Sequence, residues 1–109
     1  MDKEIYCGSD MRYKRVEEKF RLTSAQIAHA PLMKFQWKKQ TEGMSKIGTS
    51  AQYWENILPE LVVYDSVADF KRLNYQSLGV AMGISLAREI EYLKKQIAEL
   101  KEQLKNYEQ

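Results

Sequence analysis

Residues 85–109 read SLAREIEYLKKQIAELKEQLKNYEQ, a stretch without glycine or proline that consists mostly of strong helix formers. Its apolar residues recur at alternating spacings of three and four, which is the heptad pattern of a coiled coil. The core positions of this seam are Ile90, Leu93, Ile97, Leu100 and Leu104, with Tyr107 next in the series. A stripe this narrow is typical of a helix that pairs with another helix. We therefore expect a self-associating helix, and a helix packed on its own domain is the alternative.

The positions beside the seam carry charged and amide side chains, as in a solvated coiled coil. They are Glu89, Lys94, Gln96, Lys101 and Gln103. Isoleucine at one core position with leucine at the other favours two strands in a parallel coiled coil. Upstream, Gly79 and Gly83 fall on the same seam. They either let helices approach closely or loosen the start of the helix, because each costs about 1 kcal/mol relative to alanine.

The residues between 23 and 74 predict a mixed α+β core. Thr23 or Ser24 can cap a short helix that Pro31 stops, and alternating apolar residues indicate short strands. The expected elements are helices over 25–30 and 51–58, strands over 33–37 and 46–50 joined by a polar turn over 38–45, and a second hairpin from 61–64 and 70–73. We expect an upstream remnant or linker over 1–8, a core domain over 9–78 and a coiled-coil helix over 79–109.

Composition places the chain among small globular domains and excludes several kinds of site. It has 109 residues, of which 44% are hydrophobic and 29% charged, with a formal net charge of +2. That charge argues against a strongly basic nucleic-acid binder. With one cysteine, Cys7, and one histidine, His29, the chain has no internal disulfide and no ligand set for zinc. We expect no cofactor, metal, nucleic-acid partner or membrane partner, and we expect His29 to lie at a helix end.

The segment GSDMRYK, residues 8–14, contains the serine and lysine of a possible catalytic dyad. A serine hydroxyl becomes a nucleophile when a base takes its proton, and a lysine does this when burial or a neighbouring cation favours its neutral form. On a strand, Ser9 and Lys14 would lie about 16 Å apart, and on a helix they would not share a face. They therefore meet only if the chain bends between them or across subunits. Arg12 is the neighbouring cation, and the Asp10 carboxylate would have to point away, toward Arg12.

Several motifs stand in one order along the chain. They are Ser-Asp-x-Arg-x-Lys at Ser9, Asp10, Arg12 and Lys14; Phe-x-Trp at Phe35 and Trp37; Gly-x-x-Ala-Gln at Gly48, Ala51 and Gln52; Leu-Pro-Glu-Leu-Val over 58–62; and Asn74-Tyr75 before the long helix. From Ser9 to about Leu104 the chain resembles the intramolecular chaperone auto-processing domain of phage endosialidase tailspikes. The same domain occurs in phage tail fibres and neck appendage proteins, and in the animal myelin regulatory factor.

The resemblance implies a homotrimeric chaperone that ends an elongated, β-structured shaft, brings three chains into register and then removes itself. It implies a self-cleaving serine endopeptidase of a single turnover, with Ser9 as nucleophile, Lys14 as general base and Gly8–Ser9 as the scissile bond. Asp10 and Arg12 would orient the site. The partners would be other copies of the chain and the upstream shaft of the same polypeptide. Cleavage would occur in the host cytoplasm during phage assembly, with the shaft retained in the virion tail.

Two alternatives follow from the residues. One is an oligomerisation module that assembles without cleaving. The other is a nucleic-acid binder whose basic residues are Arg12, Lys14, Arg15, Lys19 and Arg21. Glu17 and Glu18 dilute that patch, and no recognition motif accompanies it. Cys7 lies outside the motif and is a weaker candidate nucleophile than Ser9.

Overall fold

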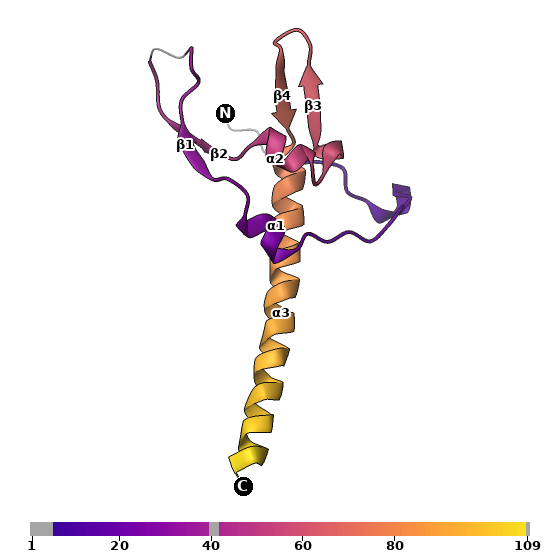
Figure 1. Ribbon diagram of the computed structural model, residues 1–109. Helices are drawn as coiled ribbons and strands as arrows, with labels where there is room; N and C mark the ends of the chain where they lie inside the picture. Colours follow the sequence, from indigo (N-terminus) through magenta and orange to yellow (C-terminus); the bar gives the residue numbers. More distant parts are fainter. Residues whose placement is uncertain (1–5, 40–41, 109) are drawn as a thin grey trace.

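Two β-hairpins and short helices surround the N-terminal end of one long helix in the computed structural model, which describes residues 6–39 and 42–108 (Figure 1). The chain is thus mixed helix and strand, with two small antiparallel sheets. The elements are η1 Met11–Tyr13, α1 Ser24–Ala28, β1 Met33–Phe35, β2 Lys46–Gly48, α2 Ala51–Glu55, η2 Pro59–Leu61, β3 Val62–Asp65, β4 Phe70–Leu73 and α3 Tyr75–Glu108. Residues 1–5 of the expected upstream remnant, 40–41 of the expected turn and Gln109 lie outside the described residues.

The long helix α3 has 34 residues, and at 1.5 Å per residue it is about 51 Å long. The Asn74 side chain accepts a hydrogen bond from the Ser77 amide at 3.1 Å, which caps the first turn. The helix continues through Gly79 and Gly83 without interruption. Because it begins at Tyr75, the domain boundary expected between 78 and 79 lies inside the helix.

The short helices begin where their capping residues predict. Thr23 and Gln26 form a reciprocal capping box at the start of α1, and the Ser50 hydroxyl accepts from the Tyr53 amide at the start of α2. His29 ends α1, as expected, and its Nδ1 lies 2.7 Å from the carbonyl oxygen of Ala25. The second helix stops at Glu55, three residues before the expected end.

The two hairpins pair in the expected order. The strands of the first are shorter than the alternating pattern indicates, whereas β4 has the expected bounds and β3 begins one residue later than expected. Met33 pairs with Gly48 in the first sheet, and Val62 pairs with Leu73 in the second. The strand expected over 33–37 ends at Phe35. Beyond it, Trp37 makes edge-to-face contacts with Phe35, at 5.2 Å between ring centroids, and with Phe70 of β4, at 6.4 Å. The aromatic side chains therefore connect the two sheets.

A side-chain cap stabilises the turn between β3 and β4. Asp65 Oδ1 accepts hydrogen bonds from the amides of Val67 and Ala68 at 3.0 and 3.1 Å. Those bonds, with the Ala68 amide the larger contributor, and an ion pair to Arg72 lower the pKa of Asp65. Asp69 completes the turn at φ 55°, a conformation that aspartate tolerates better than most residues.

The first hairpin meets the start of α3 through a close approach at Gly48. The Thr49 amide donates to the Tyr75 hydroxyl at 3.3 Å. A Cβ atom added to Gly48 would lie 2.7 Å from that hydroxyl oxygen and 3.1 Å from the Phe35 ring. The absent side chain is therefore what lets Tyr75 reach β2.

The core of the chain is small and lies against one face of α3. Leu22, Trp54 and Leu78 are each 1% exposed, and Leu58 completes the buried cluster. Ser85 is the buried polar residue, and its hydroxyl accepts a hydrogen bond from the Leu22 amide at 3.0 Å. This bond satisfies a backbone donor that would otherwise be buried without a partner.

We predict that Ser85→Ala lowers the free energy of unfolding by about 1–3 kcal/mol, because the buried Leu22 amide loses its acceptor. Urea denaturation at a fixed protein concentration measures the change. The matched control is Ser77→Ala, an exposed serine of the same helix, for which we expect a change within about 0.5 kcal/mol. Equal losses in the two variants would contradict the assigned role of the Leu22–Ser85 bond.

Candidate functional site

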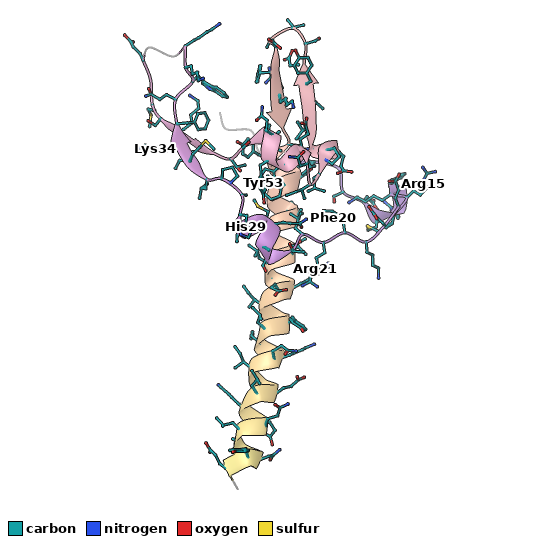
Figure 2. All side chains as sticks on the ribbon, in the orientation of Figure 1. Arg15, Phe20, Arg21, His29, Lys34 and Tyr53 are labelled. Carbon is teal, nitrogen blue, oxygen red and sulfur yellow. The ribbon has the colours of Figure 1, made fainter. Side chains whose placement is uncertain are left out.

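The head is defined here as residues 22–39 and 42–73, which hold the short helices α1, α2 and η2 and both hairpins. The N-terminal arm, defined here as residues 6–21, extends sideways from the head and returns to α3 (Figure 1). Figure 2 places Arg15 at the outer part of the arm and Arg21 beside the long helix. The return is fixed by the Leu22–Ser85 bond and by an ion pair between Arg21 and Glu89 at 2.7 Å. Ahead of this attachment, the arm carries the Ser-Asp-x-Arg-x-Lys motif away from the core.

The chain bends inside the motif, as the proposed dyad requires. Asp10 caps the 3₁₀ turn η1, with its carboxylate accepting from the Arg12 amide at 3.0 Å and its carbonyl accepting from the Tyr13 amide at 3.1 Å. The Lys14 amide then donates to the Met11 carbonyl at 3.2 Å. This turn reverses the chain, and Lys14 Nζ lies 2.9 Å from Ser9 Oγ within one chain.

The Asp10 carboxylate points toward Arg12, in the orientation that the sequence analysis required. Arg12 Nη2 lies 2.7 Å from Asp10 Oδ2, and Arg12 Nε lies 3.1 and 3.2 Å from the two carboxylate oxygens. The side-chain bond to Arg12, followed by the bond to its amide, lowers the pKa of Asp10. The same pair raises the pKa of Arg12. The Asp10 carboxylate thus stabilises the turn through its bonds to Arg12, while the Lys14 ammonium donates to Ser9.

The dyad is open to water in the single chain. Gly8, Ser9, Asp10, Arg12 and Lys14 are all exposed. A Cβ atom added to Gly8 would meet nothing within 4 Å, so there is open space beside the Gly8 α-carbon. One chain therefore supplies the hydrogen bond between Lys14 and Ser9, and leaves both side chains exposed to water.

The predicted seam is exposed between Ile90 and Leu104 of α3. Ile90, Leu93, Ile97, Leu100 and Leu104 are between 47% and 62% exposed. The head packs on a different face of the helix, through residues that occupy other heptad positions. These residues are Leu78, Ala81, Met82 and Ser85, with Glu89 paired to Arg21. Among the described residues, the hydrophobic core cluster and the side chains packed against it include none of these five seam residues.

The exposed surface is too large for a compact monomer of this size. The accessible area is 10152 Å², whereas a folded monomer of 12.8 kDa exposes about 6,300 Å². The radius of gyration is 20.0 Å, against about 13 Å for a compact domain of this length. The excess area, about 3,900 Å², is several times the roughly 800 Å² that one partner buries in a standard interface.

Other expected features also have defined places in the structure. Two of the five basic residues of the alternative nucleic-acid patch, Arg12 and Arg21, form ion pairs, and Lys14 donates to Ser9. Among the described residues, no helix is long and apolar enough to span a bilayer, and no three metal-ligating side chains gather. Gln76, which no sequence motif singles out, hydrogen-bonds with the Cys7 thiol through its side-chain amide. The sequence feature that could have indicated Gln76 is its heptad spacing from Gly83 and Ile90, which places it at the same core position.

We predict that the Asp10 carboxyl titrates with a midpoint below its usual value of 3.8. Because the folded pKa is lowered, the Asp10–Arg12 pairing is present at neutral pH and is lost only as the pH falls through that lowered value. Carbon-13 NMR of the carboxyl group measures the midpoint. Arg12→Gln should raise it, whereas Arg15→Gln, on the same arm, should leave it unchanged. An Asp10 midpoint at or above 3.8 in the unaltered chain would refute the pairing.

Comparison of the chain with protein-family models, with curated proteins and with solved structures finds no match. A function for this chain therefore rests on the contacts of its own residues. Foremost among them is the hydrogen bond between Lys14 and Ser9.

Proposed function

We propose that this chain is a C-terminal intramolecular chaperone that assembles as a homotrimer and cleaves its own Gly8–Ser9 bond. The observation that carries the proposal is the 2.9 Å distance between Lys14 Nζ and Ser9 Oγ, which a capped turn brings about in an otherwise extended arm. General-base activation of a serine requires a hydrogen bond of this length. The order of the family motifs along the chain adds support.

The proposed cleavage occurs within one chain, because nucleophile, base and scissile bond all lie on one turn. Neutral Lys14 takes the proton of Ser9 Oγ, and the oxygen attacks the Gly8 carbonyl carbon. The C–N bond then breaks, and the proton passes from Lys14 to the Ser9 amine. The resulting ester joins the Gly8 carboxyl to the Ser9 oxygen. Water hydrolyses that ester, which frees Gly8 as a new C-terminus and restores the serine hydroxyl.

Assembly supplies what the single chain lacks at this site. A lysine accepts a proton only in its neutral form, and removal of water from around a lysine favours that form. Ser9 and Lys14 are exposed in one chain, so a neighbouring protomer is the source of burial. Cleavage would then follow association, which is the order that a chaperone needs. A chain that has not assembled would remain uncleaved and would keep its chaperone domain.

The seam on α3 is the surface that we assign to association. Its apolar side chains are exposed, and the head of the same chain occupies another face of the helix. The proposal of three strands rests on the family resemblance alone. The seam residues by themselves, isoleucine at one core position and leucine at the other, favour two strands in a parallel coiled coil. A linked upstream shaft would gain from this arrangement, since a coiled coil raises the effective concentration of the shaft chains.

After cleavage, the shaft would persist without its template. A β-structured trimer with many contacts distant in sequence is slow to nucleate, and its native state is then held by the barrier to unfolding. We place these events in the host cytoplasm during phage assembly, with the shaft as part of a tailspike, tail fibre or neck appendage.

Replacement of either dyad residue should abolish processing without loss of assembly. We expect the precursor with its upstream shaft to release a fragment that begins at Ser9, and Ser9→Ala and Lys14→Met to remain whole. A denaturing gel and the mass of the fragment measure the outcome. The matched controls are Ser45→Ala and Lys19→Met, exposed residues of the same types, which should process normally. Fragment release by Ser9→Ala would exclude the serine mechanism, and a whole but assembled unaltered precursor would indicate a non-cleaving module.

Disruption of the seam should separate the protomers. Ile97→Asp places a carboxylate at a core position, and we expect the association to weaken by at least about a hundredfold because burial of an unpaired charge costs several kcal/mol. Sedimentation equilibrium measures the mass against concentration. Lys95→Asp, two residues away and outside the seam, is the control and should retain the oligomer. An unchanged mass for Ile97→Asp would show that another surface holds the protomers together.

A further inference from the structure

A groove of about 700 Å³ lies between the two hairpins of the head. Side chains of β1, β2 and β4 line it, together with the start of α2 and Tyr75 of α3. Binding sites for small ligands and peptide side chains have volumes of about 300–1,000 Å³. Among the described residues, those of the dyad turn and of the seam do not line this groove. It is therefore separate from both surfaces that the proposed function uses.

The groove has an apolar and aromatic lining. Met33, Phe35 and Trp37 line it from the first hairpin, and Phe70 lines it from β4. The Trp37 ring makes edge-to-face contacts with Phe35 and Phe70, so the rings fix one another in position. Trp37 is nevertheless 56% exposed. A fixed tryptophan that stays exposed in a groove is the kind of residue that a bound partner covers.

The groove also carries positive charge. Lys46, Lys71 and Arg72 line it, and none of the described acidic residues does. An ion pair with Glu55 balances Lys71, and an ion pair with Asp65 balances Arg72. Lys46 is exposed and has no ion-pair partner in the described part of the chain. The uncompensated charge in the groove is therefore that of Lys46.

The hairpin that carries Lys46 is basic as a whole. Residues 33–48 contain four lysines and one glutamate, and within residues 6–39 and 42–108 none of these lysines forms an ion pair. Phe35 pairs with Lys46 across the sheet, so the two side chains lie on the same face. An anionic group bound to Lys46 would thus lie beside the aromatic lining. The four lysines are Lys34, Lys38, Lys39 and Lys46.

The strands beside the groove have unpaired edges. In the described part of the chain, β1 and β2 pair only with each other, and so do β3 and β4. Each strand therefore leaves one row of backbone N–H and C=O groups without a strand partner. An extended peptide can add to such an edge through main-chain hydrogen bonds, while its alternate side chains enter the adjoining groove. A nucleic acid or a lipid surface cannot pair with a strand edge in this way, so the open edges favour a peptide.

A second copy of this chain does not suit the charge of the groove. Its extended N-terminal arm holds four basic and two acidic side chains over residues 14–21. That segment would bring positive charge against the lysines of the first hairpin, and like charges across an interface oppose binding. The acidic groups that fit the groove therefore come from another polypeptide.

We propose that the groove between the hairpins binds an extended acidic segment of another polypeptide, which adds as a strand to an edge of the first sheet. A carboxylate of this segment pairs with Lys46, and its apolar side chains lie against Phe35 and Trp37. This inference goes beyond the proposed function. Neither the Ser9–Lys14 dyad nor the seam takes part in the binding.

Fluorescence anisotropy of labelled peptides tests the inference with the full chain. The probe is a peptide of about ten residues that alternates valine and glutamate, so that its side chains match the period of a strand. We expect saturable binding that weakens with added salt, because salt screens the charges. The matching valine–lysine peptide should bind at least about tenfold more weakly, because its charges repel the hairpin. N-methylation of the backbone amides of the valine–glutamate peptide should abolish binding, because it removes the main-chain donors.

Two variants locate the binding in the groove, each with a matched control on α3. Lys46→Glu should lower the affinity about tenfold, because an attraction becomes a repulsion. Trp37→Ala should lower it by a similar factor of about ten, because the peptide loses its aromatic contact. The controls Lys95→Glu and Tyr92→Ala replace exposed residues of the same types and should bind as the unaltered chain does. Urea denaturation checks that each variant is folded, and Lys46→Glu carries the test alone if Trp37→Ala is not.

Several results would overturn the inference. They are the absence of binding to the valine–glutamate peptide, equal affinity for the valine–lysine peptide, and full affinity in Lys46→Glu. Full affinity of the N-methylated peptide would contradict strand addition. Tighter binding of an oligothymidylate, or of vesicles that contain phosphatidylserine, would assign the groove to a nucleic acid or to a membrane instead. Cleavage and association are measured separately, so a chain that binds the peptide but does not cleave or associate contradicts the proposed function alone.

Discussion

The hydrogen bond from the Leu22 amide to the buried Ser85 hydroxyl determines how the rest of the molecule is arranged. It attaches the end of the N-terminal arm to α3, and the face of the helix that carries Ser85 packs against the head. Arg21 and Glu89 reinforce the joint from the adjoining turn. Since one face of a helix cannot pack against its own head and against another helix at once, the seam is left exposed on a different side.

This division of α3 separates the contacts of the head from the seam that the proposed association would use. The apolar residues of the seam begin at Ile90, and at the first turn of the helix Gln76 hydrogen-bonds with Cys7, two residues before Ser9. The dyad turn lies on the arm between that contact and the Leu22 joint. Ser9 and Lys14 are hydrogen-bonded but exposed, so under the proposed function a second copy would have to supply the burial of the dyad. Association therefore governs the proposed cleavage.

Local signals predicted most of the fold, and the ends of the elements depended on packing. The strand expected through Trp37 stops at Phe35 because the Trp37 ring lies between Phe35 and Phe70, and Phe70 belongs to the other hairpin. The helix expected through Leu58 stops at Glu55. Leu58, which precedes a proline, is held outside the helical region and lies in the core. Phe70 is distant from Trp37 in sequence, and Leu22 and Leu78 of the core are distant from Leu58, so periodicity could not reveal these contacts.

The sequence by itself determined the long helix, its heptad seam, the helix caps and the order of the two hairpins, because each depends on residues a few positions apart. It also named Ser9 and Lys14, but as residues that an extended arm would keep apart. Only the tertiary structure decided that the Asp10-capped turn brings them to 2.9 Å. It likewise decided that Ser85 faces the head and that Cys7 rests on Gln76, contacts 63 and 69 residues apart in sequence. Contacts over such separations follow from how the chain packs and not from local propensity.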